Sequence, residues 1–332
     1  MLTKSKSLCI KYARIFAAFL IFMCHVFSIS DKSIVTAMSL FLNVGVYIFL
    51  FVSGVIYSKR NVAIKQTIFQ FSKQRYVRIA EPIVIWMLAV VIINRICGYS
   101  ITIKQVLSHL FNLEIFLPQI YGMDHLWFVS VIMLCYILKW LIDYFNVNLH
   151  LCLVILIGIL AVFFLLDDTN WITYIICIIT FTVGLLCGGG QVFYVHNASI
   201  ITSVLMITIS VFIRLIGWRL LDGSTIYYIV VGFTQMIIGI SFFFCLMRFA
   251  PSLERMYKNE YVRKSVDWLN SINYEFYIVH YLYICGSLAI SKYVQNNIMM
   301  FLSTVLLSIA SAQVLHSVLQ IIHKTMEVHN HE

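Results

Sequence analysis

Charged residues are scarce in this sequence. Asp, Glu, Lys and Arg make up 11% of the 332 residues, whereas hydrophobic residues make up 61%. Soluble domains have about a quarter of their residues charged and about half apolar. This composition excludes an ordinary soluble fold and fits a lipid bilayer, in which each crossing helix needs roughly 20 mostly apolar residues. Repeats, low-complexity tracts and Gly/Ser-rich linkers are also lacking, so we expect one domain over residues 1–332.

Motifs for metal binding, redox chemistry and serine nucleophiles are absent as well. The nine cysteines show no C-x-x-C spacing, which argues against zinc and against a redox pair. No other metal-ligand spacing and no nucleophilic serine motif is present, so no metal is expected. The simplest interpretation of the cysteines is that they pack between helices.

Apolar runs of spanning length recur along the whole chain. They predict an all-α, polytopic transmembrane bundle of about ten helices, the first of them uncleaved. The predicted spans are 12–30, 39–57, 79–97, 125–145, 149–166, 171–189, 198–217, 226–247, 267–290 and 298–320.

The distribution of Lys and Arg predicts the orientation. With both termini in the cytoplasm, 17 of the 23 Lys and Arg residues fall in inner segments. The longest inner segments are 58–78 and 248–264, and the longest outer one is 98–124. The net charge of +9 then orients the chain in the membrane and lies next to anionic lipid. No nucleic-acid partner is expected.

Ionisable residues inside membrane helices are costly and are therefore functional candidates. In the first helix, Arg14 and His25 are eleven residues apart, so they share one face about 16 Å apart along the axis. Arg14 lies near the inner surface and His25 in the outer half. The simpler alternatives are an arginine that reaches to the interface and a histidine that packs in the core.

Arg75 and Arg78 form a second candidate site. Arginines at i and i+3 share a helix face and offer planar, bidentate donors that suit phosphate. Glu81 lies at i+3 from Arg78 and could hold it in place. The alternative is an ordinary positive-inside cluster.

Two further groups of candidate residues lie on predicted helices in the outer half of the membrane. His125 and Trp127 follow the long outer loop, and an interfacial anchor explains the tryptophan better than the histidine. Near the end of the chain, Glu275, Tyr277 and His280 share one predicted helix. Packing could explain the tyrosine, whereas an intramembrane carboxylate needs a partner.

Depth sorts these residues into two sets. Three histidines lie in the outer half on three helices, and three arginines lie at the inner surface. A ligand with an anionic head inside and a reactive end about 16 Å away would meet both sets. Coenzyme A, with its phosphorylated nucleotide and long pantetheine arm, has about that shape.

At this point the sequence resembles the acyltransferase 3 family of multipass membrane O-acyltransferases. The family's Arg-x10-His and Arg-x-x-Arg motifs match Arg14 with His25 and Arg75 with Arg78. Its second-helix, His-Leu-Trp-Phe and late Ser-Tyr-x-x-Tyr-x-x-His elements are also present, with Leu50 and Asn273 as departures. These three elements match Gly45, Val46, Phe49, Ser53 and Gly54; His125, Leu126, Trp127 and Phe128; and Tyr274, Tyr277 and His280. The five motifs occur in the family's order across nearly the whole chain.

The resemblance implies transfer of an acyl group, usually acetyl, from cytoplasmic acetyl-CoA to a carbohydrate hydroxyl. The acceptor would be an envelope polysaccharide or its lipid-linked precursor, at a bacterial cytoplasmic membrane. Some members carry an extra hydrolase-like domain, and we expect this chain to be of the membrane-only type.

The expected roles follow from the resemblance and from the residue chemistry. Arg75, Arg78 and Arg14 bind the CoA phosphates, and His25 is the general base or a transient acyl carrier. His125 or Glu275 orients His25 or helps to bind the acceptor. Trp127, Tyr277 and His280 contribute to substrate binding.

Two alternative functions stay open. A transporter or flippase for a glycan or its precursor would also line its path with them. A scaffolding subunit of a polysaccharide-synthesis complex would not need them. The acceptor sugar, the kind of acyl group and the oligomeric state are not indicated, although Tyr121, Trp127 and Trp171 could stack on sugar rings.

Overall fold

The computed structural model describes residues 4–30, 33–58, 66–189 and 200–329, and these are mainly helical. Within them, eight helices are long and apolar enough to cross a membrane. The predicted all-α polytopic bundle is confirmed. Two further predicted spans correspond to the 17-residue α7 (Leu149–Leu165) and the 12-residue α13 (Asn273–Ile284).

The chain divides into two compact units, and each is described by itself. The first comprises described residues within 1–20, 41–72 and 134–267, and the second those within 21–40, 73–133 and 268–332. The division falls inside α1 (Lys4–Ser28), α2 (Ser33–Leu42), α4 (Ile68–Ile96), α6 (Trp127–Tyr144) and α12 (Glu260–Ser271).

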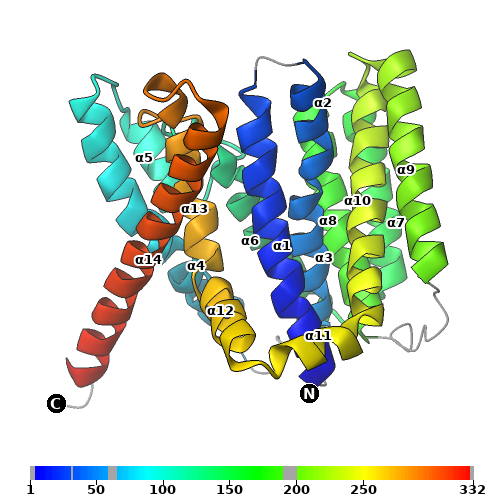
Figure 1. Ribbon diagram of the computed structural model, residues 1–332. Coiled ribbons are helices and arrows are strands. Elements are labelled where there is room, and N and C mark those ends of the chain that lie inside the picture. Colours follow the sequence, from blue (N-terminus) through cyan, green and yellow to red (C-terminus); the bar gives the residue numbers. More distant parts are fainter. Residues whose placement is uncertain (1–3, 31–32, 59–65, 190–199, 330–332) are drawn as a thin grey trace. The chain divides into compact units, whose positions relative to one another are not determined.

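The first unit is a bundle built around α3 (Val44–Tyr57), α8 (Thr169–Gly189) and α10 (Thr225–Arg248), which contact one another. α7 packs on α8, and α9 (Ile200–Leu221) packs on α10 (Figure 1). The short helix α11 (Ala250–Tyr257) follows α10.

Glycines allow α3 and α8 to approach closely. A Cβ built on Gly54 would lie 2.1 Å from the Phe181 carbonyl oxygen, and one on Gly184 would lie 2.3 Å from the Phe51 carbonyl oxygen. Helices in lipid associate largely through such close packing, because the surrounding tails are as apolar as the side chains. The two backbones therefore meet at these glycines.

The second unit contains α4, α13 and the long α14 (Asn297–His329), with α5 (Ile103–Leu110) and the short turns η1 (Asp124–Leu126) and η3 (Ile290–Lys292). α13 and α14 contact each other (Figure 1). The C-terminal end of α1 joins them through a core of Phe22, Val26 and Ile284, against which Phe276 and Phe301 pack.

The helix predicted over 79–97 begins earlier, at Ile68. A capping box starts it: the Thr67 amide donates to Gln70 Oε1 at 3.1 Å, and the Gln70 amide donates to Thr67 Oγ1 at 3.3 Å. Arg75 and Arg78 therefore lie within α4 rather than in a loop before it. The rest of the predicted inner loop, residues 59–65, lies outside the described residues.

The single helix predicted over 267–290 is wrong in its bounds. The amphipathic α12 ends at Ser271, and α13 runs only from Asn273 to Ile284. Twelve residues span about 18 Å, which is less than the roughly 30 Å hydrocarbon core. α13 is therefore a buried helix segment within the second unit.

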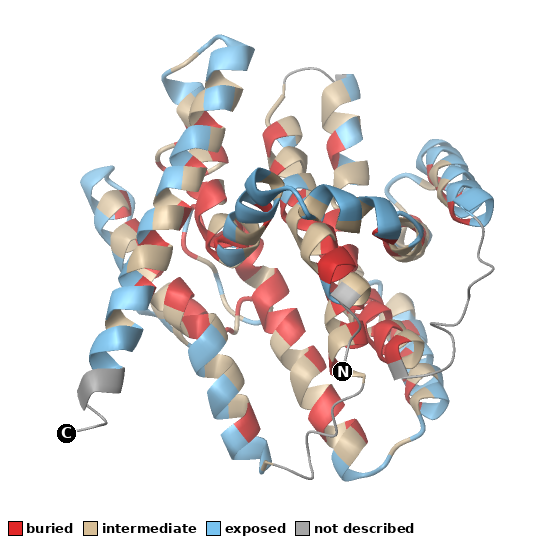
Figure 2. Ribbon diagram, turned by 60° about the horizontal axis from the view of Figure 1, so that its bottom comes forward, coloured by how far each residue is buried: buried red, intermediate tan, exposed pale blue. Residues whose placement is uncertain are grey.

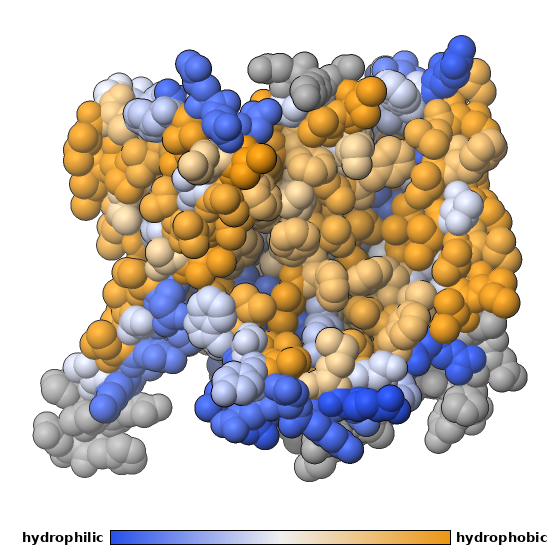
Figure 3. All heavy atoms as spheres, in the orientation of Figure 1, coloured by the Kyte–Doolittle hydropathy of each residue, from blue (hydrophilic) through white to orange (hydrophobic). Residues whose placement is uncertain are grey.

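Burial and hydropathy agree with helices that face lipid. Figure 2 shows exposed and half-buried residues along the terminal helix, with buried residues on the helices inside. Figure 3 shows apolar side chains over most of the visible face and hydrophilic ones gathered over α11 and α12.

Candidate active site

Three histidines meet in the second unit, each from a different segment. His25 lies near the end of α1, His125 lies in η1 before α6, and His280 lies in α13. Their ring centroids are 6.0 Å apart for His25 and His125, 5.4 Å for His25 and His280, and 4.9 Å for His125 and His280. Residues separated by up to 255 positions thus form one imidazole cluster.

His125 and Tyr277 fix each other. The His125 ring donates from Nε2 to the Tyr277 carbonyl oxygen at 2.7 Å, and the Tyr277 hydroxyl donates to the His125 carbonyl oxygen at 2.7 Å. A neutral imidazole that donates from Nε2 keeps a lone pair on Nδ1. That Nδ1 is buried and has no hydrogen-bond partner among the described residues.

His280 is held in a similar way by its own helix. Its Nδ1 donates to the Phe276 carbonyl oxygen at 3.1 Å, and its ring lies 5.9 Å from both the Phe22 and the Phe276 ring. Its Nε2 is buried and likewise has no hydrogen-bond partner in the described part of the chain. The cluster therefore holds two oriented neutral imidazoles, each with an open basic nitrogen.

His25 differs from the other two histidines in accessibility. His125 is 4% exposed and His280 is not exposed, whereas His25 is half-buried. The Tyr281 ring lies 4.8 Å from both His25 and His125 and is also half-buried. His25 is thus the least buried imidazole of the cluster.

Glu275 pairs with a residue that the sequence analysis missed. His316 of α14 lies with Nδ1 2.7 Å from Glu275 Oε1, and the Gln320 amide nitrogen lies 2.9 Å from His316 Nε2. An amide donating to Nε2 leaves the proton on Nδ1, which then donates to the carboxylate. Glu275 is 7% exposed, so this pair is largely buried.

A second histidine of α14 continues the pattern. His323 Nε2 lies 2.8 Å from Oε2 of Glu81, the residue expected to hold Arg78. A periodic polar face within an apolar segment marks α14 in the sequence, and it comprises Gln313, His316, Gln320 and His323. This 3-4-3 spacing was the available signal for these partners.

The remaining predicted site residues lie away from the cluster or in the other unit. Arg75 is half-buried and Arg78 is exposed on α4, and Arg14 belongs to the first unit. Trp127 begins α6, with its ring 6.5 Å from Phe128. The structure thus gathers His25, His125, Tyr277 and His280, and pairs Glu275 with α14.

The long loop before His125 has a buried polar core of its own. His109 Nδ1 lies 3.2 Å from Glu114 Oε1, and the Ile120 amide donates to His109 Nε2 at 3.0 Å. Ser130 of α6 accepts from the Glu114 amide at 2.9 Å and also contacts the Glu114 carboxylate. These contacts fix the loop that leads to His125, and the amphipathic α5 was their only sequence signal.

A metal ion and a phosphorylated nucleotide would each need particular side chains. Among the described residues, no three His, Cys, Asp or Glu side chains are arranged to hold a metal ion. The arginines of α4 are the groups that could bind a phosphorylated nucleotide, because guanidinium matches phosphate geometry.

A cluster of imidazoles within a polytopic helical bundle provides groups that can take up and release protons in a membrane protein. The acyltransferase 3 family model, described as an acyltransferase domain, matches residues 7–317. The chain therefore belongs to this family and is a membrane acyltransferase. Searches of curated proteins and of solved structures gave no match.

Proposed function

We propose that this protein is an O-acetyltransferase of the bacterial cytoplasmic membrane. It moves an acetyl group from cytoplasmic acetyl-CoA to a hydroxyl of a surface polysaccharide or its lipid-linked precursor. The observation that carries this proposal is the imidazole cluster, in which the accessible His25 lies beside two buried, oriented histidines. Family membership supports acyl transfer, and the cluster supplies a base for an alcohol acceptor.

The reaction needs one proton to move and one acyl bond to be exchanged. His25 removes the proton from the acceptor hydroxyl as its oxygen attacks the thioester carbonyl. The tetrahedral intermediate then expels the CoA thiolate, which takes the proton from the His25 imidazolium. The products are the acetyl ester and free CoA. A neutral imidazole suits this general-base role, which typically contributes 10²–10⁴-fold.

The alternative route passes through His25 itself. Its ring nitrogen attacks the thioester carbonyl and expels the CoA thiolate, which leaves an acetyl-imidazolium. The acceptor hydroxyl then attacks the acetyl group, its proton passes to the thiolate, and the free imidazole returns. His125 and His280 are positioning residues on either route, because both are buried and hydrogen-bonded to backbone carbonyls. A single imidazolium in the cluster is favoured, since two at this spacing would repel each other.

The donor site lies at the other end of the second unit. Arg75 and Arg78 are about two and three turns into α4, and their planar donors suit the CoA phosphates. Arg14, about 16 Å from His25 along α1, belongs to the first unit, and its predicted role toward the CoA phosphates stays a prediction. Trp127 and Tyr277 complete the acceptor side, with Tyr277 acting through His125.

The test uses the full-length protein in lipid nanodiscs and in cells. His25→Ala and His25→Gln should lower surface-glycan acetylation at least 100-fold, measured by mass spectrometry, and should leave acetyl-CoA binding intact. His150→Gln, an exposed histidine of α7, is the matched control and should change neither readout. Full acetylation in His25→Ala at normal protein levels would overturn the mechanism.

Other outcomes identify the alternative functions. A flippase would not bind acetyl-CoA, and a scaffold would tolerate Arg75→Ala combined with Arg78→Ala. Incubation with radiolabelled acetyl-CoA alone separates the two routes, because only the covalent route leaves label on His25.

A further inference from the structure

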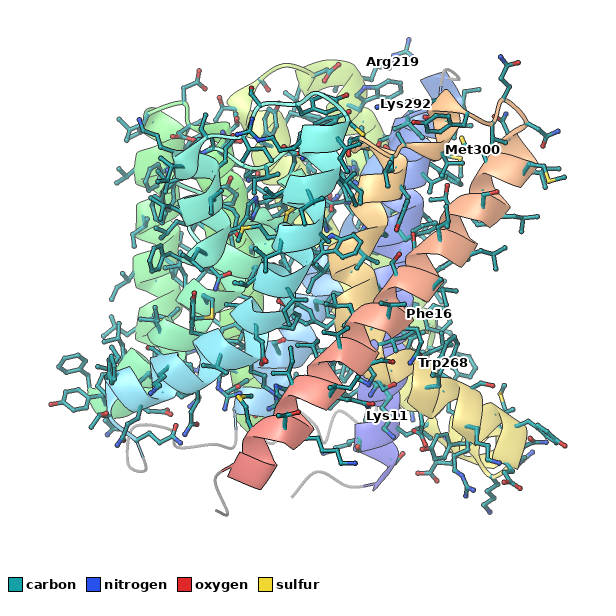
Figure 4. The ribbon with its side chains drawn as sticks, turned by 90° about the vertical axis from the view of Figure 1, so that its left-hand side faces the viewer. Lys11, Phe16, Arg219, Trp268, Lys292 and Met300 are labelled. Atoms are coloured by element: carbon teal, nitrogen blue, oxygen red, sulfur yellow. The ribbon has the colours of Figure 1, made fainter. Side chains whose placement is uncertain are left out.

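Two tyrosines and a lysine form a platform next to the histidine cluster, at the end of the second unit expected to face outward. The Tyr99 and Tyr121 rings pack with centroids 4.7 Å apart and an interplanar angle of 33°. The Lys292 ammonium lies 5.9 Å from each centroid. Figure 4 shows Lys292 near Met300 at the start of α14, at the opposite end of this unit from Trp268. We call Tyr99, Tyr121 and Lys292 the tyrosine–lysine platform.

One buried residue builds the tyrosine pair. Asn94 is not exposed. Its side-chain amide donates to the Tyr121 carbonyl oxygen at 2.9 Å, and its backbone carbonyl oxygen accepts from the Tyr99 backbone amide at 2.9 Å. Gly98 and Gly122, with φ of +84° and +89°, turn the chain directly beside each tyrosine. The paired rings are therefore held by the fold, although each tyrosine remains 37% exposed.

The lysine is oriented as well. Its ammonium donates to the carbonyl oxygens of Gly286 and Ser287, both at 3.3 Å. An ammonium has three donors, so one remains for a ligand. The charge is exposed and sits against aromatic rings, an arrangement that suits an anion joined to an apolar or sugar face.

The platform is continuous with the histidines. A Cβ built on Gly122, next to Tyr121, would lie 3.1 Å from Leu282 Cδ1 and 3.3 Å from the Gly286 Cα, and the turn η1 with His125 begins two residues later. The Tyr281 ring in turn lies 4.8 Å from His25 and from His125. A sugar resting on the platform would thus lie beside the turn that carries His125.

We infer that the tyrosine–lysine platform is the acceptor subsite and that it takes an acidic sugar, one bearing a carboxylate or a phosphate next to the hydroxyl that is acylated. This rests on the proposed function. The sugar's C–H face packs on the exposed tyrosine surface, and its anionic group binds the free donor of Lys292. The tyrosines give contact area at low entropic cost, and the lysine selects for charge.

The experiment compares Lys292→Gln with Lys292→Arg in cells that make their own glycan. Lys292→Gln should lower glycan acetylation at least tenfold, and Lys292→Arg should keep most of it. Lys104→Gln, an exposed lysine of α5 in the same unit, is the matched control and should behave as wild type. Mass fragmentation of the wild-type glycan should place the acetyl group on, or next to, an acidic sugar.

Two readouts keep this inference separate from the proposed function. Purified Lys292→Gln protein should bind acetyl-CoA as wild type does. If wild-type protein binds none, the proposed function fails instead. Unchanged acetylation in Lys292→Gln, or a neutral acceptor with neutral neighbours, would overturn the subsite.

A lipid headgroup is the competing source of an anion for Lys292. Nanodiscs of phosphatidylcholine alone and with phosphatidylglycerol distinguish the two. If wild-type protein, and not Lys292→Gln, is stabilised against heat by phosphatidylglycerol, Lys292 is a lipid site and the acceptor assignment is wrong. Equal stabilisation of both proteins supports the acceptor.

Discussion

His125 and Tyr277 are joined by two reciprocal hydrogen bonds, each 2.7 Å long, between residues 152 positions apart in the sequence. One bond sets the tautomer of the imidazole, and the other ties its backbone to α13. Together they lock the start of α6 to the helix that carries His280.

Tyr277→Phe removes one of these bonds and keeps the ring. The buried His125 carbonyl loses its hydroxyl donor, which costs about 1–3 kcal/mol of stability. We expect the turnover number to fall about tenfold, which corresponds to roughly 1.4 kcal/mol, with acetyl-CoA affinity unchanged.

Tyr283→Phe is the matched control for this change. It lies on the same helix, and its hydroxyl contacts Ser311 Oγ at 2.6 Å. Equal losses of turnover in both variants would show that Tyr277 stabilises α13 without positioning His125.

The Glu275–His316 pair should show strong energetic coupling. Removing His316 leaves the Glu275 carboxylate buried without this partner, because Glu275 is 7% exposed, and removing Glu275 leaves a half-buried His316 Nδ1 without its acceptor. Glu275→Ala and His316→Ala should each destabilise the protein by about 1–3 kcal/mol, and the double variant by much less than their sum. Unfolding titrations in mixed micelles measure the cycle, and additive losses would contradict a direct pair.

The α3–α8 contact should not tolerate a methyl group. Gly54→Ala places a Cβ 2.1 Å from the Phe181 carbonyl oxygen, so the helices must separate, at a cost of about 1–3 kcal/mol. Gly158→Ala in α7 is the control, because no atom lies within 4 Å of its Cβ. It should be neutral or stabilising by up to about 1 kcal/mol. Similar thermal denaturation of the two variants would rule out close packing at Gly54.

The stability of the first unit should depend on pH through the Asp267 carboxyl. Hydrogen bonds from Lys11 and then Tyr257 hold the pKa of this carboxyl below its ordinary value. A lowered folded-state pKa contributes stability above the unfolded value, near pH 4, that is lost as the pH falls further.

Asp267→Asn should therefore melt at a lower temperature than wild type at pH 6, and the difference should shrink below about pH 4. Because Asp267 is largely exposed, we expect a small effect. A difference that persists at pH 3 would assign the stabilisation to packing.

The sequence predicts the helical bundle well because lipid imposes a long apolar run on each crossing segment. It also predicts that His25, His125 and His280 share a depth, since depth depends on position along each helix. Which side chains pair across helices depends on rotation and packing, so the partnership of Glu275 with His316 was not predicted. The early start of α4 was missed because Thr67 and Gln70 decide it by local hydrogen bonding.

The short length of α13 was missed for a related reason. Apolar residues continue beyond Ile284, through Cys285, Leu288, Ala289 and Ile290, and hydropathy carries no information about where the backbone leaves the helix. Chain geometry near Gly286, which packs against Leu282, decides the end of α13.

The end of α13 also lies beside Lys292, whose ammonium stabilises it. The ammonium is bound to two carbonyl oxygens just beyond α13, where the negative end of a helix dipole favours a cation. The same helix carries Tyr277 and His280 on its earlier turns. Lys292 therefore stabilises the end of the helix that holds these two residues.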